Sequence, residues 1–173
     1  MSSAPASPAD RLAVSDTLLR YCSSVDVKDL ATTRTLFTDD ATASYGGSDW
    51  IQGADRIVAW LDAMTHEQAY QHHLLSVYHV DIDPSTPDEA TALSYLTSHQ
   101  IHRDDPDTVL MLVSRYYDTL KRVDGQWLIS KKEYVIGWAE TRTAPQSLLH
   151  EAPPSLDLPA PVTTRPRQRH RPR

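Results

Sequence analysis

Several residues of this chain could pass a proton to one another. His72 and His73 are adjacent, and a histidine ring titrates near neutrality, so either could take up a proton at working pH. Neighbouring side chains in a strand point to opposite faces, so only one of the two can enter a pocket. Asp26, at the predicted end of the first helix, could accept a hydrogen bond from an imidazole and stabilise the imidazolium. These residue types predict acid–base chemistry.

Each of these residues also has a simpler interpretation. Asp26 could be a solvated acid, although its negative charge would then lie at the unfavourable end of the helix dipole. Each histidine could lie on the surface. His99 and His102, with His73, could form only an adventitious metal site, because their spacing is not that of a metal motif.

Other chemistries lack their motifs. The five glycines form no phosphate-binding loop, and there is no Gly-x-Ser-x-Gly elbow around a nucleophilic serine. The single cysteine, Cys22, cannot form an internal disulfide and lies on an apolar helical stripe, which predicts a core position. We therefore expect neither a cofactor nor a metal.

Helical periodicity comes first along the chain, and strand patterns follow. Apolar spacing predicts helices at about 8–26 and 28–37 and a third helix after Gly53, with a short strand at 41–45 between the last two. An Asp124-Gly125 pair predicts a hairpin turn. The long strands are predicted at 73–83, 90–103, 109–122 and 127–140. Helices followed by antiparallel strands indicate an α+β fold.

Composition divides the chain into a folded body and two looser ends. Residues 1–7 are predicted to be a flexible N-terminus and residues 8–142 a single domain. The segment 143–173 holds seven of the twelve prolines and five arginines, and is predicted to be extended or disordered.

Charge and hydropathy exclude some partners and locations. Without the five arginines of the tail the chain has 12 basic and 23 acidic residues, which argues against nucleic acid as the main ligand. No apolar run approaches the roughly 20 residues of a membrane helix, and the N-terminus does not resemble a secretory signal. We therefore expect a cytoplasmic protein without a membrane partner.

Several short motifs follow one another in order across the body. They are YCSSVDVKD at 21–29, LFTDDA at 36–41, a helix after Gly53, HLLS at 73–76, SRYYD at 114–118 and RVDGQW at 122–127. Together they resemble the SnoaL-like family of the NTF2-like superfamily, in its scytalone dehydratase and bile-acid dehydratase branch. Val77 stands where the family has an Asn four residues after its His. The resemblance implies a cone of three N-terminal helices on a strongly curved, mostly antiparallel sheet that encloses a pocket. It also implies a homodimer.

The resemblance assigns roles to individual residues. His73, rather than His72, matches the family's base, and Asp26 matches the Asp that pairs with it. Tyr21 and His99 match positions that supply an acid in some branches. Five residues of an ideal helix span about 500°, so Tyr21 and Asp26 do not share a helix face. The residues expected to contact substrate are Tyr45, Trp50, Leu75 and Tyr116. Lys131 and Lys132 stand where some relatives keep an Arg that binds an acidic substrate group, and a lysine would not bind a carboxylate in the same two-point way.

The predicted function is a cofactor-independent lyase that dehydrates a small hydrophobic or aromatic hydroxylated substrate, as in secondary or aromatic metabolism. An isomerase, an aldol cyclase or a retro-aldol lyase could use the same residues. A dimeric module that binds a small ligand without turnover is the alternative from another class, because fold alone does not settle function.

Overall fold

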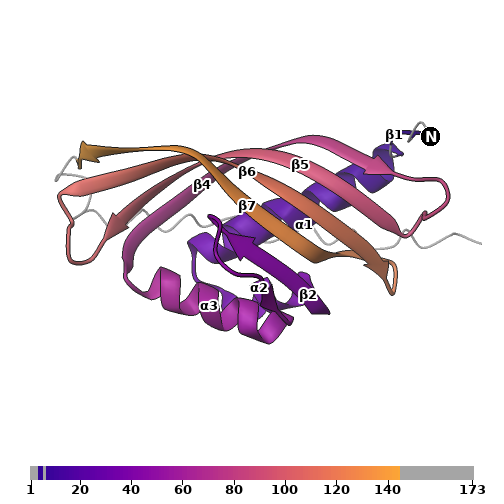
Figure 1. Cartoon of the computed structure of the whole chain (residues 1–173), viewed down its shortest axis with the longest axis horizontal. Helices are drawn as coiled ribbons and strands as arrows, with labels where there is room; N and C mark the ends of the chain where they lie inside the picture. The colour runs from indigo at the N-terminus through magenta and orange to yellow at the C-terminus, as the bar shows by residue number, and fades with distance from the viewer. Residues whose placement is uncertain (1–3, 6, 145–173) are drawn as a thin grey trace, which may run out of the picture.

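Helices precede the long strands along the chain, in the order predicted from the sequence (Figure 1). The computed structural model describes residues 4–5 and 7–144, so almost all of the predicted tail lies outside the described residues. The helices are α1 (Pro8–Asp26), α2 (Leu30–Thr35) and α3 (Ala54–His66). The strands are β1 (Ala4–Pro5), β2 (Phe37–Tyr45), β3 (Ile51–Gln52), β4 (Gln68–Ile82), β5 (Glu89–His102), β6 (Thr108–Val123) and β7 (Gln126–Thr143).

The strands form one sheet in the order β1-β4-β5-β6-β7-β2-β3. All pairs are antiparallel except β2 with β7, which run parallel. Figure 1 shows the long strands as a twisted, curved layer with the three helices on one side of it. This arrangement confirms the predicted α+β cone of helices on a curved, mostly antiparallel sheet.

Two strands begin earlier than the sequence indicates. Strand β2 starts at Phe37, and α2 is correspondingly shorter than predicted. Phe37 is buried edge-to-face against Tyr21, and the backbone N–H of Ile129 donates to the carbonyl of Leu36 at 2.8 Å. Strand β4 starts at Gln68 because this segment pairs with the end of β5. Tertiary pairing therefore sets both boundaries.

The turn between β6 and β7 has the predicted form. Asp124 and Gly125 adopt φ values of 50° and 79°, the left-handed pair that a tight type I′ hairpin needs. This turn fixes the start of β7, which carries several residues of the site described below.

Helix α1 is anchored at its N-terminal end. The Ser7 side chain accepts a hydrogen bond from the backbone N–H of Asp10 at 3.1 Å, a cap of a kind that contributes about 1 kcal/mol. The Asp10 carboxylate accepts hydrogen bonds from Arg122 at 2.7 Å and from the indole of Trp127 at 3.3 Å. These contacts hold the helix against the β6–β7 hairpin and so help set the direction in which its other end points.

The hydrophobic core lies between the helices and the concave face of the sheet. Its fully buried members include Val14 and Leu18 of α1, Ile57 of α3, Leu120 of β6 and Ile129 of β7. At the N-terminus, Ala4 and Pro5 pair with Ile82 and Asp81 of β4. Among the described residues, no helix has the length and apolar character needed to span a membrane.

Candidate active site

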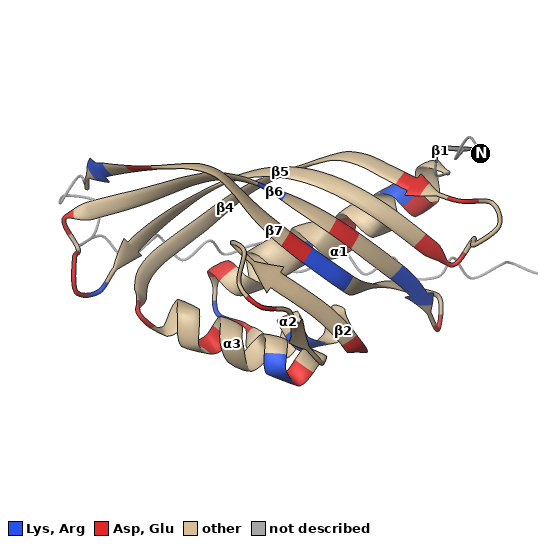
Figure 2. Ribbon diagram, in the orientation of Figure 1, with Lys and Arg blue, Asp and Glu red and all other residues tan. Residues whose placement is uncertain are grey.

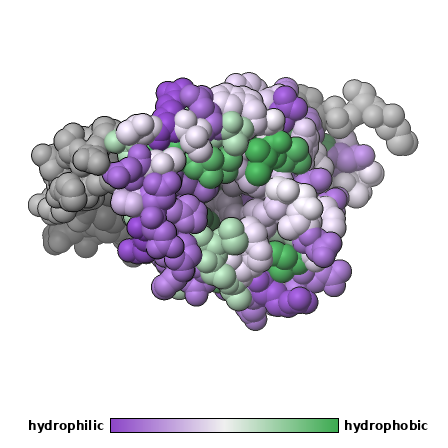
Figure 3. Space-filling model, turned by 60° about the vertical axis from the view of Figure 1, so that its left-hand side comes forward, coloured by the Kyte–Doolittle hydropathy of each residue, from purple (hydrophilic) through white to green (hydrophobic). Residues whose placement is uncertain are grey.

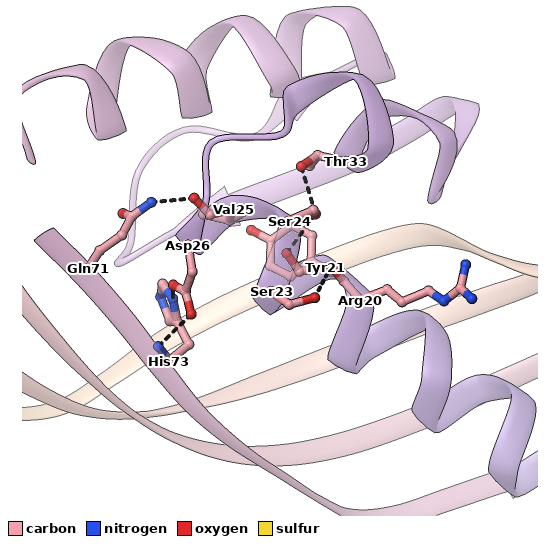
Figure 4. Close-up of polar contacts among 9 residues, drawn as sticks. All are labelled: Arg20, Tyr21, Ser23, Ser24, Val25, Asp26, Thr33, Gln71 and His73. Atoms are coloured by element: carbon pink, nitrogen blue, oxygen red, sulfur yellow. Dashed lines mark hydrogen bonds and ion pairs between the residues drawn. The ribbon is translucent and has the colours of Figure 1, made fainter. Parts of the chain in front are cut away.

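Asp26 and His73 contact each other at two points (Figure 4). The Oδ1 atom of Asp26 lies 2.5 Å from the ring Nδ1 of His73, and its Oδ2 accepts the backbone N–H of His73 at 3.0 Å. Asp26 is the last residue of α1, and His73 lies in β4. Their side chains are only 16% and 11% exposed, so water competes little for these bonds. The double contact fixes the plane and direction of the imidazole.

Two further contacts join the end of α1 to β4 around this pair. The Gln71 side-chain amide donates to the backbone carbonyl of Val25, which also accepts the backbone N–H of Lys28 at 3.1 Å at the end of the helix. Lys28 follows the helix with a left-handed φ of 58°, and its ammonium donates to the backbone carbonyl of Gln68 at 2.7 Å. The Asp26–His73 pair is thus held between two side-chain-to-backbone bonds.

His73 lines a cavity of about 290 Å³ between the sheet and the helices. A hollow bordered by apolar residues is visible on the face shown in Figure 3. Most lining side chains are aromatic, aliphatic or uncharged polar. They are Tyr21, Val25, Tyr45, Trp60, Leu61, Met64, Thr65, Gln68, Gln71, His73, Gln100, Leu112, Tyr116, Tyr134 and Ile136, together with the backbone of Gly46.

Hydroxyl groups of buried tyrosines lie within this wall. The hydroxyls of Tyr21 and Tyr45 are 3.0 Å apart and share a hydrogen bond, and Ser114 donates to the Tyr134 hydroxyl at 2.9 Å. Burial raises the pKa of Tyr21 well above its usual value and also raises the pKa of Tyr45. Both phenols therefore stay protonated at neutral pH and can act as hydrogen-bond donors.

The position of Tyr21 on α1 agrees with helix geometry. Tyr21 packs edge-to-face on Phe37 and Tyr116 and reaches the cavity directly. Asp26 leaves the helix in another direction and borders a separate groove between α1 and β4, which His73 also lines. The two residues therefore need not share a helix face, because Asp26 contacts the His73 ring and His73 also lines the cavity.

Three predicted site residues lie away from the cavity. His99 pairs with His72 across β4 and β5, and alternation places both on the sheet face opposite His73. Leu75 packs against the core and borders the α1–β4 groove instead. Trp50 is 45% exposed, and its ring lies 4.8 Å from the ammonium of Lys131. Tyr45 and Tyr116 line the cavity, as the sequence predicts.

Figure 2 shows blue and red segments along β7, which contains two adjacent lysines. The surroundings of these lysines differ. Lys132 is 0% exposed, and its ammonium lies 2.8 Å from Asp118, which is equally buried. The same ammonium lies 3.7 Å from the ring centre of Tyr116 and 4.4 Å from that of Tyr21. Lys132 thus packs against the rings of Tyr21 and Tyr116, which line the cavity, but does not line the cavity itself.

Sequence reasoning missed Gln71, Gln68 and Tyr134. Gln71 lies two residues before His73 on the same strand, so alternation alone would have placed it on the same face. Gln68 was outside the predicted strand, and the position of Tyr134 depends on how β7 pairs with β6. Within the described residues, no group of three or more His, Cys, Asp or Glu side chains is arranged to hold a metal ion.

Comparison with known proteins places this chain in a family. A model of the SnoaL-like domain matches residues 6–133, most of the chain, so the protein belongs to the SnoaL-like family. A search of curated proteins found no match.

Solved structures share the fold at low sequence identity. A scytalone dehydratase-like protein of Novosphingobium aromaticivorans DSM 12444 is 21% identical with a TM-score of 0.69, over 79% of this chain and 91% of that one. A hexachlorocyclohexane dehydrochlorinase is 16% identical with a TM-score of 0.70, over 86% and 96%. A Mycobacterium tuberculosis protein of unknown function is 22% identical with a TM-score of 0.64, over 74% and 76%. These likenesses establish the NTF2-like fold, which does not by itself define an activity.

Proposed function

We propose that this protein is a cofactor-independent lyase that removes water from a small hydrophobic or aromatic hydroxylated substrate. The observation that carries the proposal is the two-point contact between Asp26 and His73 at the wall of an aromatic cavity. The related structures named as a scytalone dehydratase-like protein and a dehydrochlorinase agree with an elimination reaction.

The hydrogen bonds of His73 support its proposed role as the base. Its Nδ1 faces the Asp26 carboxylate, so the proton of the neutral ring resides there and Nε2 carries the free lone pair. Nε2 can then take a proton from a substrate carbon in the cavity. The Asp26 carboxylate stabilises the imidazolium that results.

Tyr45 donates to the Tyr21 hydroxyl, which in turn donates to the substrate, and both phenols keep their protons. Because burial raises the pKa of both phenols, complete transfer of a proton from either one would be costly. A donated hydrogen bond instead stabilises negative charge on a substrate oxygen as the C–H bond breaks. The pair is already formed, so little reorganisation is needed.

The proton balance closes within the site. His73 removes a proton from carbon, the C–H electron pair forms the new C=C bond, and the neighbouring C–O bond breaks. The imidazolium of His73 returns its proton to the departing oxygen, which leaves as water. Return of the proton to another carbon would give an isomerase with the same residues.

Incubation of the wild-type protein in D₂O with hydroxylated aromatic, polyketide-like and steroidal compounds tests the proposal. Mass spectrometry should detect a product that has lost one water. Incorporation of deuterium into the compound without loss of water would indicate an isomerase instead of a lyase. Thermal stabilisation by a compound that is neither dehydrated nor exchanged would contradict the proposal and favour a binding module.

A further inference from the structure

Gln68 lines the cavity and carries a buried hydrogen-bonding atom that has no partner among the described residues. It is the first residue of β4, lines the cavity and is only 5% exposed. Its side-chain Nε2 lies 3.0 Å from Nε2 of His102, which holds one end of the amide. Its Oε1 is buried and has no hydrogen-bond partner among the described residues. The Oε1 end of the Gln68 amide is therefore unsatisfied among the described residues.

An unsatisfied buried amide favours a ligand that can complete its hydrogen bonds. Leaving such a group unpaired costs free energy, which a bound partner recovers. An amide can turn about its last bond, so its open end presents either an oxygen or an NH₂ group. A hydroxyl both donates and accepts, so it can pair with either end.

The charge of the lining sets a second condition on the ligand. None of the described residues that line the cavity is Lys, Arg, Asp or Glu. The nearby cation Lys132 is fully buried and already paired with Asp118. A carboxylate in this cavity would lose its hydration without gaining a lysine or arginine partner, and the ring of His73 is already paired with Asp26, so its binding is unfavourable.

Cavity size sets a third condition. A volume of about 290 Å³ lies at the lower end of the range of roughly 300–1,000 Å³ for small-molecule sites. The stacked rings of Tyr45 and Trp60 and the tilted pair of Tyr116 and Tyr134 offer flat surfaces for a planar ligand. One or two rings fit this space better than four.

We propose that the substrate is an uncharged compound of one or two rings whose hydroxyl binds Gln68, and that Gln68 is the residue that selects it. This inference rests on the proposed function in using the same cavity, but it concerns which ligand binds. Through its contact with the Gln68 amide, His102 is a positioning residue.

Three probes of similar size test the selectivity in the wild-type protein: 2-naphthol, naphthalene and 2-naphthoate. Equilibrium dialysis gives the Kd of each. We expect 2-naphthol to bind about tenfold more tightly than naphthalene, the contribution of one buried hydrogen bond, and 2-naphthoate to bind most weakly. Equal binding of 2-naphthol and naphthalene, or tightest binding of 2-naphthoate, would overturn the inference.

Gln68→Met assigns the selectivity to one residue, since methionine keeps the length of the side chain and removes the amide. We expect the Kd of 2-naphthol to rise about tenfold, to that of naphthalene, while the Kd of naphthalene stays unchanged. Gln126→Met, on an exposed residue at the start of β7, serves as the matched control. A folded Gln68→Met protein that still prefers 2-naphthol would contradict the assignment. If the variant fails to fold, the wild-type ranking of the three probes decides.

Failure of this inference is distinguishable from failure of the proposed function. Preference for 2-naphthol without turnover of any compound would support the ligand assignment and contradict the proposed lyase activity. Turnover that depends on His73 but requires a carboxylate on the substrate would support the proposed lyase activity. It would contradict the assignment of an uncharged, hydroxylated substrate.

Discussion

The Asp26 carboxylate holds His73 through both of its oxygens, one on the ring Nδ1 at 2.5 Å and one on the backbone N–H at 3.0 Å. A single contact would leave the imidazole free to rotate, whereas this pair fixes the free Nε2 relative to the strand. The arrangement joins the end of α1 to β4, so the fold itself determines where the proposed base points.

Asp26→Asn should lower kcat strongly while leaving KM nearly unchanged. An amide keeps the shape, but it can present an NH₂ to Nδ1 and stabilise the wrong tautomer. Substitutions of this kind in other acid–base sites cost up to about 10⁴-fold in kcat. Steady-state kinetics on the substrate found in the panel would measure the effect. Asp16→Asn, on the exposed part of the same helix, is the control. Equal kcat values for Asp26→Asn and wild type would exclude an orienting role.

Tyr21→Phe should reduce turnover without unfolding the protein. The ring contacts with Phe37 and Tyr116 remain, and only the hydrogen bond to Tyr45 is lost, at a cost of about 1 kcal/mol in unfolding free energy. Loss of a donor to a developing oxyanion should lower kcat by roughly 100-fold. Urea unfolding and kinetics on the same preparation separate the two effects. Tyr78→Phe, on an exposed ring, should change neither quantity.

Removing one member of the buried Lys132–Asp118 pair should lower the free energy of unfolding strongly. Replacing both members with apolar residues should lower it much less. Lys132→Met alone leaves the Asp118 carboxylate buried without its partner and should lower the unfolding free energy by about 3–5 kcal/mol. The double variant Lys132→Met/Asp118→Leu should recover much of that loss. Urea denaturation of both variants is the measurement. A double variant no more stable than the single one would show that the charges themselves are needed.

Alkaline pH should destabilise the protein through its buried tyrosines. Burial raises the pKa of Tyr21, Tyr45 and Tyr116 in the folded state. In the unfolded chain each phenol ionises near pH 10. The stability is therefore fully present below about pH 10 and falls as pH rises toward the folded values, by about 1.4 kcal/mol per pH unit for each tyrosine.

Urea midpoints between pH 8 and 11, with phenolate absorbance followed in parallel, would measure this loss. The phenolate signal of the buried tyrosines should appear together with unfolding. Tyr21→Phe should make the decline in stability with pH less steep. A buried phenolate signal that rises while the protein remains folded would contradict the assignment.

The sequence predicts those features of the site that follow from local geometry. Strand alternation leaves the His72 side chain exposed and His73 partly buried. Helix geometry keeps Tyr21 and Asp26 on different faces, and they line separate hollows. The resemblance to the family then identifies His73, rather than His72, as the base and Asp26 as its partner. Neither step required knowledge of distances.

The remaining features depend on pairings between distant segments. Lys132 is buried because β6 brings Asp118 beside it, and a lysine is rarely buried without such a partner. Gln68 lies on the cavity side because β4 begins five residues earlier than its β-branched and aromatic run suggests and its pairing with β5 shifts register between Gln68 and Tyr70. His99 was assigned by motif position alone, although its register opposite His72 turns it to the other face.

The most direct measurement is turnover of the best panel compound by His73→Ala and by His72→Ala. The two histidines are neighbours in β4, have the same chemistry and lie on opposite faces of the sheet. We expect His73→Ala to lose at least about 100-fold in kcat, the contribution of a positioned general base, and His72→Ala to match the wild type. Full turnover by His73→Ala, or an equal loss in both variants, would contradict the assignment of His73 as the base.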